Sequence, residues 1–375
     1  MRENTVSQKG KGKGEPLKLV LIGCGRVAEK HLRALRYVEK KGWGRLIAVV
    51  DPAEENARKR LRETVSGFYQ QLPIYPELQS FFAEKEADIA AITTPSGSHA
   101  ALALEALSHN CHLLIEKPLA MTGEDAEKIV SAAENAQKKV AIGHIYRYFP
   151  AVDELVSDIT AGSFGRVLYG SVDVRWGHDQ AYYDSSPWRG TRAFDGGVVM
   201  NQSIHALDLM LWLMQATSLK ETRALCDTQN HRMESEDFAS AVMRFDGDIY
   251  LNYEGSTSGD PKAQEAAFYL CCSEAEVRAS LFRGKLSFRV AKHGGKNQGF
   301  SYLRRWLKKK ICRYGLSYLW QISNPHTAIW LNLIEAIQAD APLLADAHDG
   351  LRSIEVAESI YRSAGILDPG GNGSH

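Results

Sequence analysis

The chain reads Lys18-Leu19-Val20-Leu21-Ile22-Gly23-Cys24-Gly25-Arg26-Val27-Ala28 near its start, an apolar strand that runs directly into a G-x-G-x-x-A turn. A helical pattern follows, so the segment has the strand-turn-helix context of a dinucleotide-binding fingerprint. The two glycines let the backbone approach a pyrophosphate, and the helix N-terminus supplies free N–H donors and a positive dipole. We therefore expect Gly23, Gly25, Arg26 and Val27 to contact a dinucleotide.

A carboxylate follows the second apolar strand, Leu46-Ile47-Ala48-Val49-Val50. Asp51 lies 28 positions after Gly23, where a carboxylate accepts hydrogen bonds from the adenosine ribose hydroxyls. It would also repel a 2′-phosphate, so the sequence favours NAD over NADP. The alternative makes Asp51 a plain turn residue.

Short apolar runs alternate with helical patterns from Leu17 to about Ile142. This alternation is typical of β-α-β units around a parallel sheet. The expected strands are 18–22, 46–50, 89–92, 112–115 and 140–142. The first part of the chain is therefore predicted to be an α/β Rossmann domain with a doubly wound parallel sheet.

The alternation of apolar runs and helical patterns ends at about Pro150. A helix over about 151–161 precedes several strand-like runs with hairpin signals, which predict an α+β domain with a mostly antiparallel open sheet. A helical tail over about 326–364 is expected to pack back on the first domain. The expected strands are 167–176, 238–245, 249–253, 267–271 and 277–282.

These patterns divide the 375-residue chain into four parts. We expect a disordered arm at 1–15, a dinucleotide-binding domain at 16–145, a substrate and oligomerisation domain at 146–368, and a flexible tail at 369–375. The length suits two domains, each with its own core.

Composition narrows the class of protein. The 45 basic and 45 acidic side chains balance, which argues against nucleic acid as a partner. The six cysteines form no metal-type cluster, so reduced thiols, no metal and a cytoplasmic location are expected. Polar residues interrupt the most apolar stretch, 198–214, which argues against a membrane span.

The expected strand 89–92 leads into the loop Thr93-Thr94-Pro95-Ser96-Gly97-Ser98-His99. Its carboxyl end lies at the sheet edge where ligands of doubly wound folds bind. We expect Thr94, Pro95 and His99 to cover the nicotinamide half of the cofactor. His99 alternatively only starts the next helix.

The expected strand 112–115 leads into Glu116-Lys117-Pro118. Together with G-x-G-x-x-A, T-P-x-x-x-H and a later G-G-x-x-x-N-x-x-x-H-x-x-D, this ordered set resembles the glucose-fructose oxidoreductase/inositol dehydrogenase/MocA family from about 17 to 364. The resemblance places Glu116 at the cofactor and Lys117 beside the nicotinamide and the reacting carbinol. A half-buried lysine there can have a lowered pKa and relay protons. The alternative is a surface lysine that extends from a strand end.

Three polar residues share one face of an apolar helix: Asn201, His205 and Asp208, spaced i, i+4, i+7. The resemblance makes His205 the general base toward a sugar hydroxyl and Lys117 its catalytic partner. Many family members have aspartate where this chain has Asn201, and an amide cannot relay a proton, so Asn201 is expected to orient substrate. That departure resembles members that act on nucleotide-linked sugars. Alternatively, His205 is a core histidine paired with Asp208.

Further substrate contacts are expected from Tyr146, Arg147, Trp188 and Arg189. An arginine grips a phosphate or carboxylate with its planar fork, and a tryptophan stacks on a ring. Alternatively, Trp188 only packs and Arg189 only forms a salt bridge. The basic segment 303–313 could contact a membrane surface, a diphosphate or another subunit, but a solvated helix is the usual explanation.

The sequence thus predicts an NAD-dependent dehydrogenase of a sugar or nucleotide sugar. A dehydrogenase of free polyols of the inositol type, a non-catalytic NAD(P)-binding sensor, and an enzyme of NAD-assisted glycoside cleavage are alternatives. By analogy with the family, the chain is expected to form a dimer or tetramer.

Overall fold

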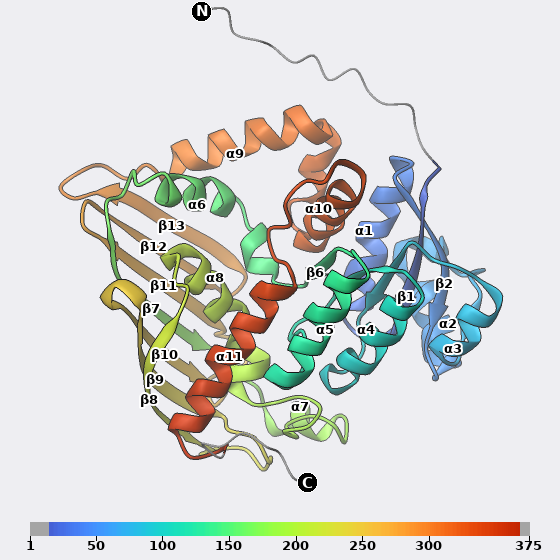
Figure 1. The fold of residues 1–375 in the computed structure, drawn as a ribbon, viewed down its shortest axis with the longest axis horizontal. Coiled ribbons are helices and arrows are strands. Elements are labelled where there is room, and N and C mark those ends of the chain that lie inside the picture. The colour runs from blue at the N-terminus through green and yellow to red at the C-terminus, as the bar shows by residue number, and fades with distance from the viewer. Residues whose placement is uncertain (1–14, 368–375) are drawn as a thin grey trace, which may run out of the picture.

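The computed structural model describes residues 15–367, so the terminal segments expected to be loose lie outside the described residues, apart from Glu15. Two β-sheets stand apart, each accompanied by helices, and the last helices of the chain lie between them (Figure 1). The site described below lies where the two halves meet.

The first sheet has six strands in the order β3-β2-β1-β4-β5-β6, and every pair of neighbours is parallel. This confirms the predicted doubly wound Rossmann sheet. Its strands are β1 (Leu17–Ile22), β2 (Gly44–Val50), β3 (Ile74–Tyr75), β4 (Ile89–Ile92), β5 (His112–Ile115) and β6 (Val140–Ile142). The prediction missed β3, which has only two residues and therefore no readable pattern.

Helices cover this sheet and follow its strands in sequence. They are α1 (Ala28–Lys40), α2 (Glu54–Glu63), α3 (Leu78–Glu84), α4 (His99–Ser108) and α5 (Gly123–Asn135). Because β1 is flanked by β2 on one side and β4 on the other, the strand order reverses between β1 and β4. Ligands of doubly wound folds bind at such a reversal, outside the carboxyl ends of the strands.

The second sheet has seven strands in the order β13-β12-β11-β7-β10-β9-β8. All neighbours are antiparallel except β7 and β10, which confirms the mostly antiparallel sheet. Its strands are β7 (Val167–Arg175), β8 (Leu219–Asp227), β9 (Phe238–Phe245), β10 (Ile249–Ser256), β11 (Glu265–Cys272), β12 (Ala275–Phe282) and β13 (Lys285–Lys292). The prediction missed β8 and β13, the two edge strands, which bury too few residues for a clear alternation.

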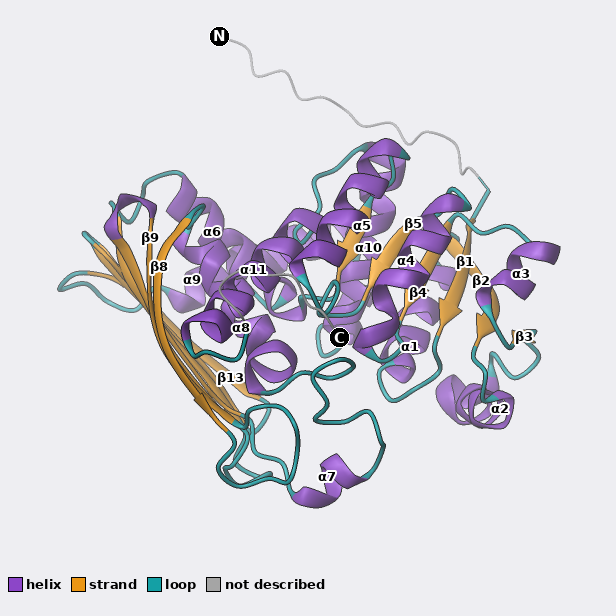
Figure 2. Cartoon of the chain, turned by 60° about the horizontal axis from the view of Figure 1, so that its bottom comes forward, coloured by secondary structure: helices purple, strands orange, loops and turns teal. Residues whose placement is uncertain are grey.

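Helices lie on one face of this sheet only, as Figure 2 shows. Helix α8 packs on β7 and β11, α11 packs on β8, and α9 and α6 pack on each other near β13. The helices are α6 (Val152–Thr160), α7 (Gln180–Asp184), the π-helical turn η4 (Val198–Ser203), α8 (Ile204–Met214), α9 (Gly299–Tyr314), the 3₁₀ turn η6 (Leu316–Gln321), α10 (Pro325–Ala339) and α11 (Ala347–Ser363).

The last two helices contact the first half of the chain. Helix α10 packs against α1, and α11 packs against α5 as well as α8. The fully buried Trp330 of α10 is among the largest side chains of the core. Within the part of the chain that the structure describes, no helix is long and apolar enough to cross a membrane.

Candidate functional site

The glycine loop between β1 and α1 is held against the loop that follows β4. Gly23 has φ +89°, and a Cβ on it would lie 2.8 Å from Cγ2 of Thr94. The Thr93 hydroxyl also donates to the carbonyl oxygen of Gly23 (2.7 Å). Only glycine fits this backbone and this close approach.

The outer side of the same loop is open. A Cβ on Gly25 would meet no described atom within 4 Å, and Arg26 is exposed beside it. Free backbone N–H groups at the start of α1, with a cation next to them, suit the pyrophosphate of a dinucleotide. The residues present therefore fit the group that the fingerprint implies.

Asp51 stands at the carboxyl end of β2, next to the glycine loop. Its Oδ2 accepts the backbone N–H of Cys24 (2.6 Å), and its Oδ1 accepts that of Ala53 (2.8 Å). These bonds fix the carboxylate at the loop and leave lone pairs on both oxygens for ribose hydroxyls. Asp51 is thus more than a plain turn residue, because it holds the glycine loop in place.

His99 does not line the cleft, contrary to the expectation from the sequence. Its side chain is fully buried, with Nδ1 2.7 Å from the carbonyl oxygen of Pro118 and Nε2 3.0 Å from that of Thr94. Burial lowers the pKa of His99. The imidazole ties the loops after β4 and β5 together, while Thr94 and Pro95 remain accessible at the sheet edge.

Glu116 is mostly buried, and its Oε1 is engaged within the protein, while its expected contact with the cofactor stays a prediction. Its Oε1 lies 2.8 Å from Nε2 of His31 and 3.4 Å from Nε2 of His326, and the Trp330 indole donates to Nδ1 of His31 (3.1 Å). Burial by itself would raise the pKa of Glu116, but the hydrogen bonds from the two histidines hold it well below its usual range. The side chain faces α1 and α10 instead of the cleft.

The atoms of His31, Glu116 and His326 lie close enough together to hold a metal ion. The indole bond argues against one. Because Trp330 donates to Nδ1 of His31, the imidazole proton must sit on Nε2, which points at Glu116. A metal-bound histidine shows the reverse pattern, in which the free ring N–H is donated outward. The cluster therefore suits hydrogen bonding within the protein.

Lys117, the next residue, points to the other side and reaches the second half of the chain. Its Nζ donates to the carbonyl oxygen of Asn201 (2.7 Å) and to its side-chain Oδ1 (2.9 Å). Burial lowers the pKa of Lys117, although the negative charges of Glu116 and Asp195 oppose that shift. Lys117 is only partly exposed, and two acceptors of Asn201 hold its ammonium group, so it is not a surface lysine that extends into solvent.

Asn201 is held from its other end by Asp195. The amide nitrogen of Asn201 donates to Asp195, whose second oxygen accepts the backbone N–H of Gly190 (2.7 Å). Asn201 lies in the π-helical turn η4, and such turns often mark functional sites. The sequence prediction did not assign Asp195 to the site, although it stands directly before the quoted G-G motif.

His205 follows in the first turn of α8 and is partly exposed. Its ring lies 5.3 Å from the ring of Tyr146 and 6.0 Å from that of His144, measured between centroids. Burial first, and then the positive charge of Lys117, hold the pKa of His205 well below its usual range. Its buried Nδ1 has no hydrogen-bond partner among residues 15–367. The lowered pKa favours the neutral imidazole near Lys117, and its Nδ1 is not used by another described residue.

Asp208 does not pair with His205, so the alternative of a core histidine satisfied by that carboxylate is wrong. Asp208 instead accepts from Nε and Nη2 of Arg147 (2.8 and 2.6 Å). Arg147 also reaches Asp349 (2.8 Å) and the carbonyl oxygen of Leu344 (2.7 Å), and it is 2% exposed. The expected contact of Arg147 with substrate is likewise wrong, because its donors join α8 and α11 inside the protein.

Arg189 lies between two aromatic rings. Its guanidinium carbon is 4.4 Å from the ring centroid of Trp188 and 4.2 Å from that of Tyr182. The ring of His178 stacks on the other partner, Tyr182, at 3.7 Å. The arginine has no carboxylate within salt-bridge distance among the described side chains, so the salt-bridge alternative does not hold.

Arg189 belongs to the same site as Lys117. The positive charges of both side chains act to lower the pKa of Asp195, which burial raises. Hydrogen bonds show the same connection, because Asp195 accepts from Gly190, the residue after Arg189, and from Asn201, which binds Lys117. The neighbouring Phe194 accepts a backbone hydrogen bond from Gly97 (3.3 Å), which brings this segment against the loop after β4. No sequence pattern pointed to Tyr182 or His178, because these residues come together with Arg189 only in the folded structure.

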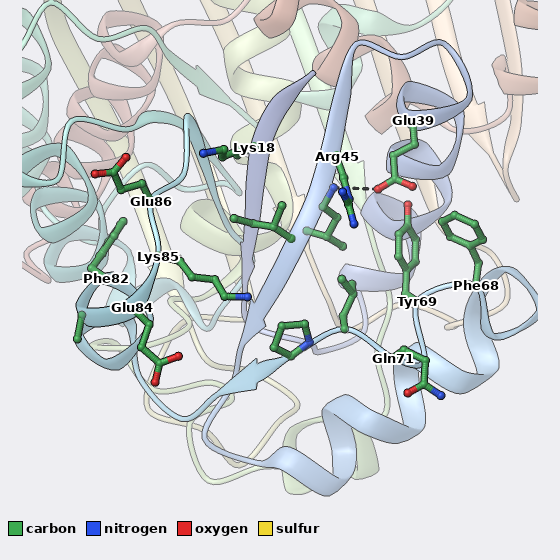
Figure 3. A pocket seen from close by; sticks show the side chains of 15 residues that line it. Lys18, Glu39, Arg45, Phe68, Tyr69, Gln71, Phe82, Glu84, Lys85 and Glu86 are labelled. Carbon is green, nitrogen blue, oxygen red and sulfur yellow. Dashed lines mark hydrogen bonds between the residues drawn. The ribbon is translucent and has the colours of Figure 1, made fainter. Parts of the chain in front are cut away.

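A wide hollow in the first half of the chain is separate from the site around Lys117 and His205. It is lined by Lys18, Arg45, Phe68, Phe82 and Glu84 among others (Figure 3). Lys18 and Arg45 belong to the amino-terminal parts of β1 and β2, at the opposite end of the strands from the glycine loop. The hollow mixes acids and bases and contains none of the groups described above.

Several known proteins are similar to this chain. The rhizopine catabolism protein MocA of Rhizobium meliloti is 30% identical over 196 residues, 52% of this chain and 56% of that protein. An inositol 2-dehydrogenase of Burkholderia lata is 25% identical over 376 residues, 92% of this chain and 99% of that protein. The chain spans about half the length of several curated relatives that it matches, MocA among them.

A solved structure with the same fold contains both a cofactor and a sugar nucleotide. The WlbA dehydrogenase of Bordetella pertussis, in complex with NADH and UDP-GlcNAcA, has a TM-score of 0.79 and 26% identity, covering 93% of this chain and 96% of that one.

Two family models together cover most of the chain. Residues 17–144 match the oxidoreductase family with an NAD-binding Rossmann fold, and residues 156–365 match the C-terminal α/β domain of the same family. The second match alone spans more than half of the 375 residues. The chain therefore belongs to the Gfo/Idh/MocA oxidoreductase family, with that family's NAD-binding fold as its first half.

Proposed function

We propose that this chain is an NAD-dependent dehydrogenase of a nucleotide-linked sugar, with Lys117 and His205 as its catalytic pair. One observation carries the proposal: Lys117 crosses from the end of β5 to Asn201, one helical turn before the uncommitted imidazole of His205. We also propose a division into a cofactor domain at 16–145 and a substrate domain at 146–368.

The two side chains have complementary tasks in the oxidation of a carbinol. His205 is neutral and accepts the hydroxyl proton as general base. An ammonium has three N–H donors, and Asn201 takes two, so one remains to hold the substrate oxygen. NAD, when bound at the glycine loop, would supply the acceptor for the hydride that leaves the carbon. In the reverse direction, His205 returns the proton.

The remaining predicted residues hold the two ligands. We assign the cofactor to Gly23, Gly25, Arg26, Val27, Asp51, Thr94 and Pro95, around the reversal between β1 and β4. Asn201 orients the substrate, because its amide is fixed between Lys117 and Asp195 and cannot relay a proton. Tyr146 shapes the wall beside His205.

Trp188 and Arg189 would recognise the distal part of the substrate. A guanidinium without a carboxylate partner, stacked between two rings, suits a carboxylate or phosphate group. The nucleotide and the acidic sugar bound to the similar WlbA dehydrogenase both carry such groups, which supports a substrate of this class.

A free polyol is the second candidate, because relatives include an inositol 2-dehydrogenase. The deciding experiment mixes the purified chain with NAD and either UDP-linked N-acetylhexosamines, their uronic acids, or free inositols, and records the absorbance of reduced nicotinamide. We expect turnover with the UDP-linked acidic sugar. Turnover with inositols alone would replace the first proposal by the second. NAD binding without turnover on any of them would favour a sensor, and release of a free aglycone would favour glycoside cleavage.

We further propose that the protein acts in the cytoplasm as a homodimer or homotetramer, with no nucleic acid as partner. The helix-free face of the second sheet, which exposes Tyr169, Val242 and Tyr250, supports self-association through that face. Light scattering of the purified chain measures the assembly directly.

A further inference from the structure

Large apolar side chains are exposed at both ends of the segment α9–η6. Trp320 is 85% exposed, Phe300 78%, Leu316 68% and Leu319 40%. Single exposed apolar residues are common, but three within five consecutive positions form a patch that needs an explanation. We call Phe300, Arg304, Lys308, Leu316, Leu319 and Trp320 together the α9–η6 patch.

One side of α9 is occupied by contacts within the protein. Tyr302 and Trp306 are buried, and Arg305 pairs with Glu154 (3.0 Å) and Asp158 (2.9 Å) of α6. Further ion pairs connect Lys309 with Glu154, Lys310 with Asp153 and Arg313 with Glu335. These contacts fix the helix against α6 and α10 and determine which side faces outward.

The outward side of α9 carries positive charge without acidic partners. Phe300, Arg304 and Lys308 follow one another at i, i+4 and i+8, so they share one face. Neither Arg304 nor Lys308 has a carboxylate within salt-bridge distance among the residues that the structure places. Residues 299–321 contain six Lys and Arg and no Asp or Glu. The sequence alone could not show which of these cations are neutralised by α6 and which are free.

We propose that the α9–η6 patch docks the protein reversibly on an anionic lipid surface. Tryptophan and leucine side chains enter the boundary between headgroups and acyl chains, where the indole is favoured. The exposed cations Arg304 and Lys308 belong to the same segment and would meet the lipid phosphates. The segment therefore carries both components that such a surface requires, the cations on α9 and most of the apolar side chains on η6.

The charge pattern favours lipid over a second copy of the chain. A two-fold contact through this patch would place the cations of one copy near those of the other. The outer face of the second sheet, by contrast, pairs both signs, since Arg175 contacts Glu254 (2.9 Å) and Glu265 (3.3 Å). In Figure 1, α9 lies along the upper edge and α7 at the lower edge, so docking through α9 leaves the α7 side of the molecule free.

Vesicle sedimentation with the full chain tests the proposal. We expect binding to vesicles of phosphatidylcholine mixed with phosphatidylglycerol and none to phosphatidylcholine alone. Replacing Leu316, Leu319 and Trp320 by serine, or reversing charge with Arg304→Glu and Lys308→Glu, should each lower binding about tenfold or more. The control Leu225→Ser, at a leucine that is 76% exposed on β8, should bind like the unmodified protein.

Each other outcome overturns the assignment. Absence of binding to the mixed vesicles would do so, as would equal binding by the triple serine variant. A smaller oligomer in the triple variant, together with no vesicle binding, would instead identify the patch as a contact between copies. Turnover of the dehydrogenase should not change in these variants, so a failed substrate assignment leaves this test intact.

Discussion

Glu116 and Lys117 are neighbours in the chain, yet their side chains enter two different environments. Around Glu116, the imidazoles of His31 and His326 and the indole of Trp330 form a closed set of hydrogen bonds. Near Lys117, the buried Nδ1 of His205 has no hydrogen-bond partner among the residues that the structure describes, and both side chains remain partly exposed.

This difference separates structural from reactive polar groups. Buried polar atoms are nearly always hydrogen-bonded, because an unsatisfied one costs free energy. A group whose donors are all engaged within the fold, such as Arg147, has no remaining capacity for a ligand. A group that the fold holds in place but leaves unsatisfied, such as His205, is poised for one.

The largest expected effect comes from removing the open imidazole. His205→Ala should lower kcat by about 10²–10⁴-fold, because a positioned general base contributes that much. NAD affinity should change little, since the cofactor loop lies on the other half of the chain. Steady-state kinetics and calorimetric NAD titration measure the two quantities, with His348→Ala, at a surface histidine, as control. Unchanged turnover would show that His205 is not the general base.

Arg147→Met tests whether Arg147 is one of the structural polar groups. It would leave Asp208 and Asp349 without their cation, and breaking a buried ion pair costs about 3–5 kcal/mol of stability. Urea unfolding should show this loss, while Arg223→Met, at an 83% exposed side chain, should show almost none. A raised KM with unchanged stability would instead return Arg147 to the substrate site.

Glu116→Gln should also lower the free energy of unfolding, but by less than Arg147→Met. The amide keeps the shape but loses the charge that accepts from His31 and His326, so we expect a loss of about 1–3 kcal/mol in unfolding free energy. Turnover should fall much less than in His205→Ala. Glu77→Gln, on the exposed start of α3, is the matched control. A collapse of kcat without loss of stability would show that Glu116 acts in the reaction.

The smallest effect concerns pH. His205 acts as base only when neutral, so kcat/KM for oxidation falls as pH drops through its pKa. Because burial and Lys117 lower that pKa, the midpoint of the acidic limb should lie below 6.5. In the residual activity of Lys117→Met, one of these causes is gone, so the midpoint should move upward. An unchanged midpoint of the acidic limb would show that the charge of Lys117 does not affect the pKa of His205.

The sequence by itself determined the fold class and the cofactor-binding half. The G-x-G-x-x-A turn and the alternation of apolar strands with helices are local patterns, and the structure and the family match confirm the doubly wound sheet and the NAD-binding fold. The motif order was likewise sufficient for the family, because each motif is read from consecutive residues.

Only the tertiary structure decided which polar side chains are open. His99, Glu116 and Arg147 follow strands whose carboxyl ends suggest a binding site, but each side chain is engaged by residues of another segment of the chain. The basic segment 303–313 likewise divides into neutralised and free cations only where α6 packs against it. Burial and hydrogen-bond satisfaction depend on residues brought together by folding, and no local pattern records those partners.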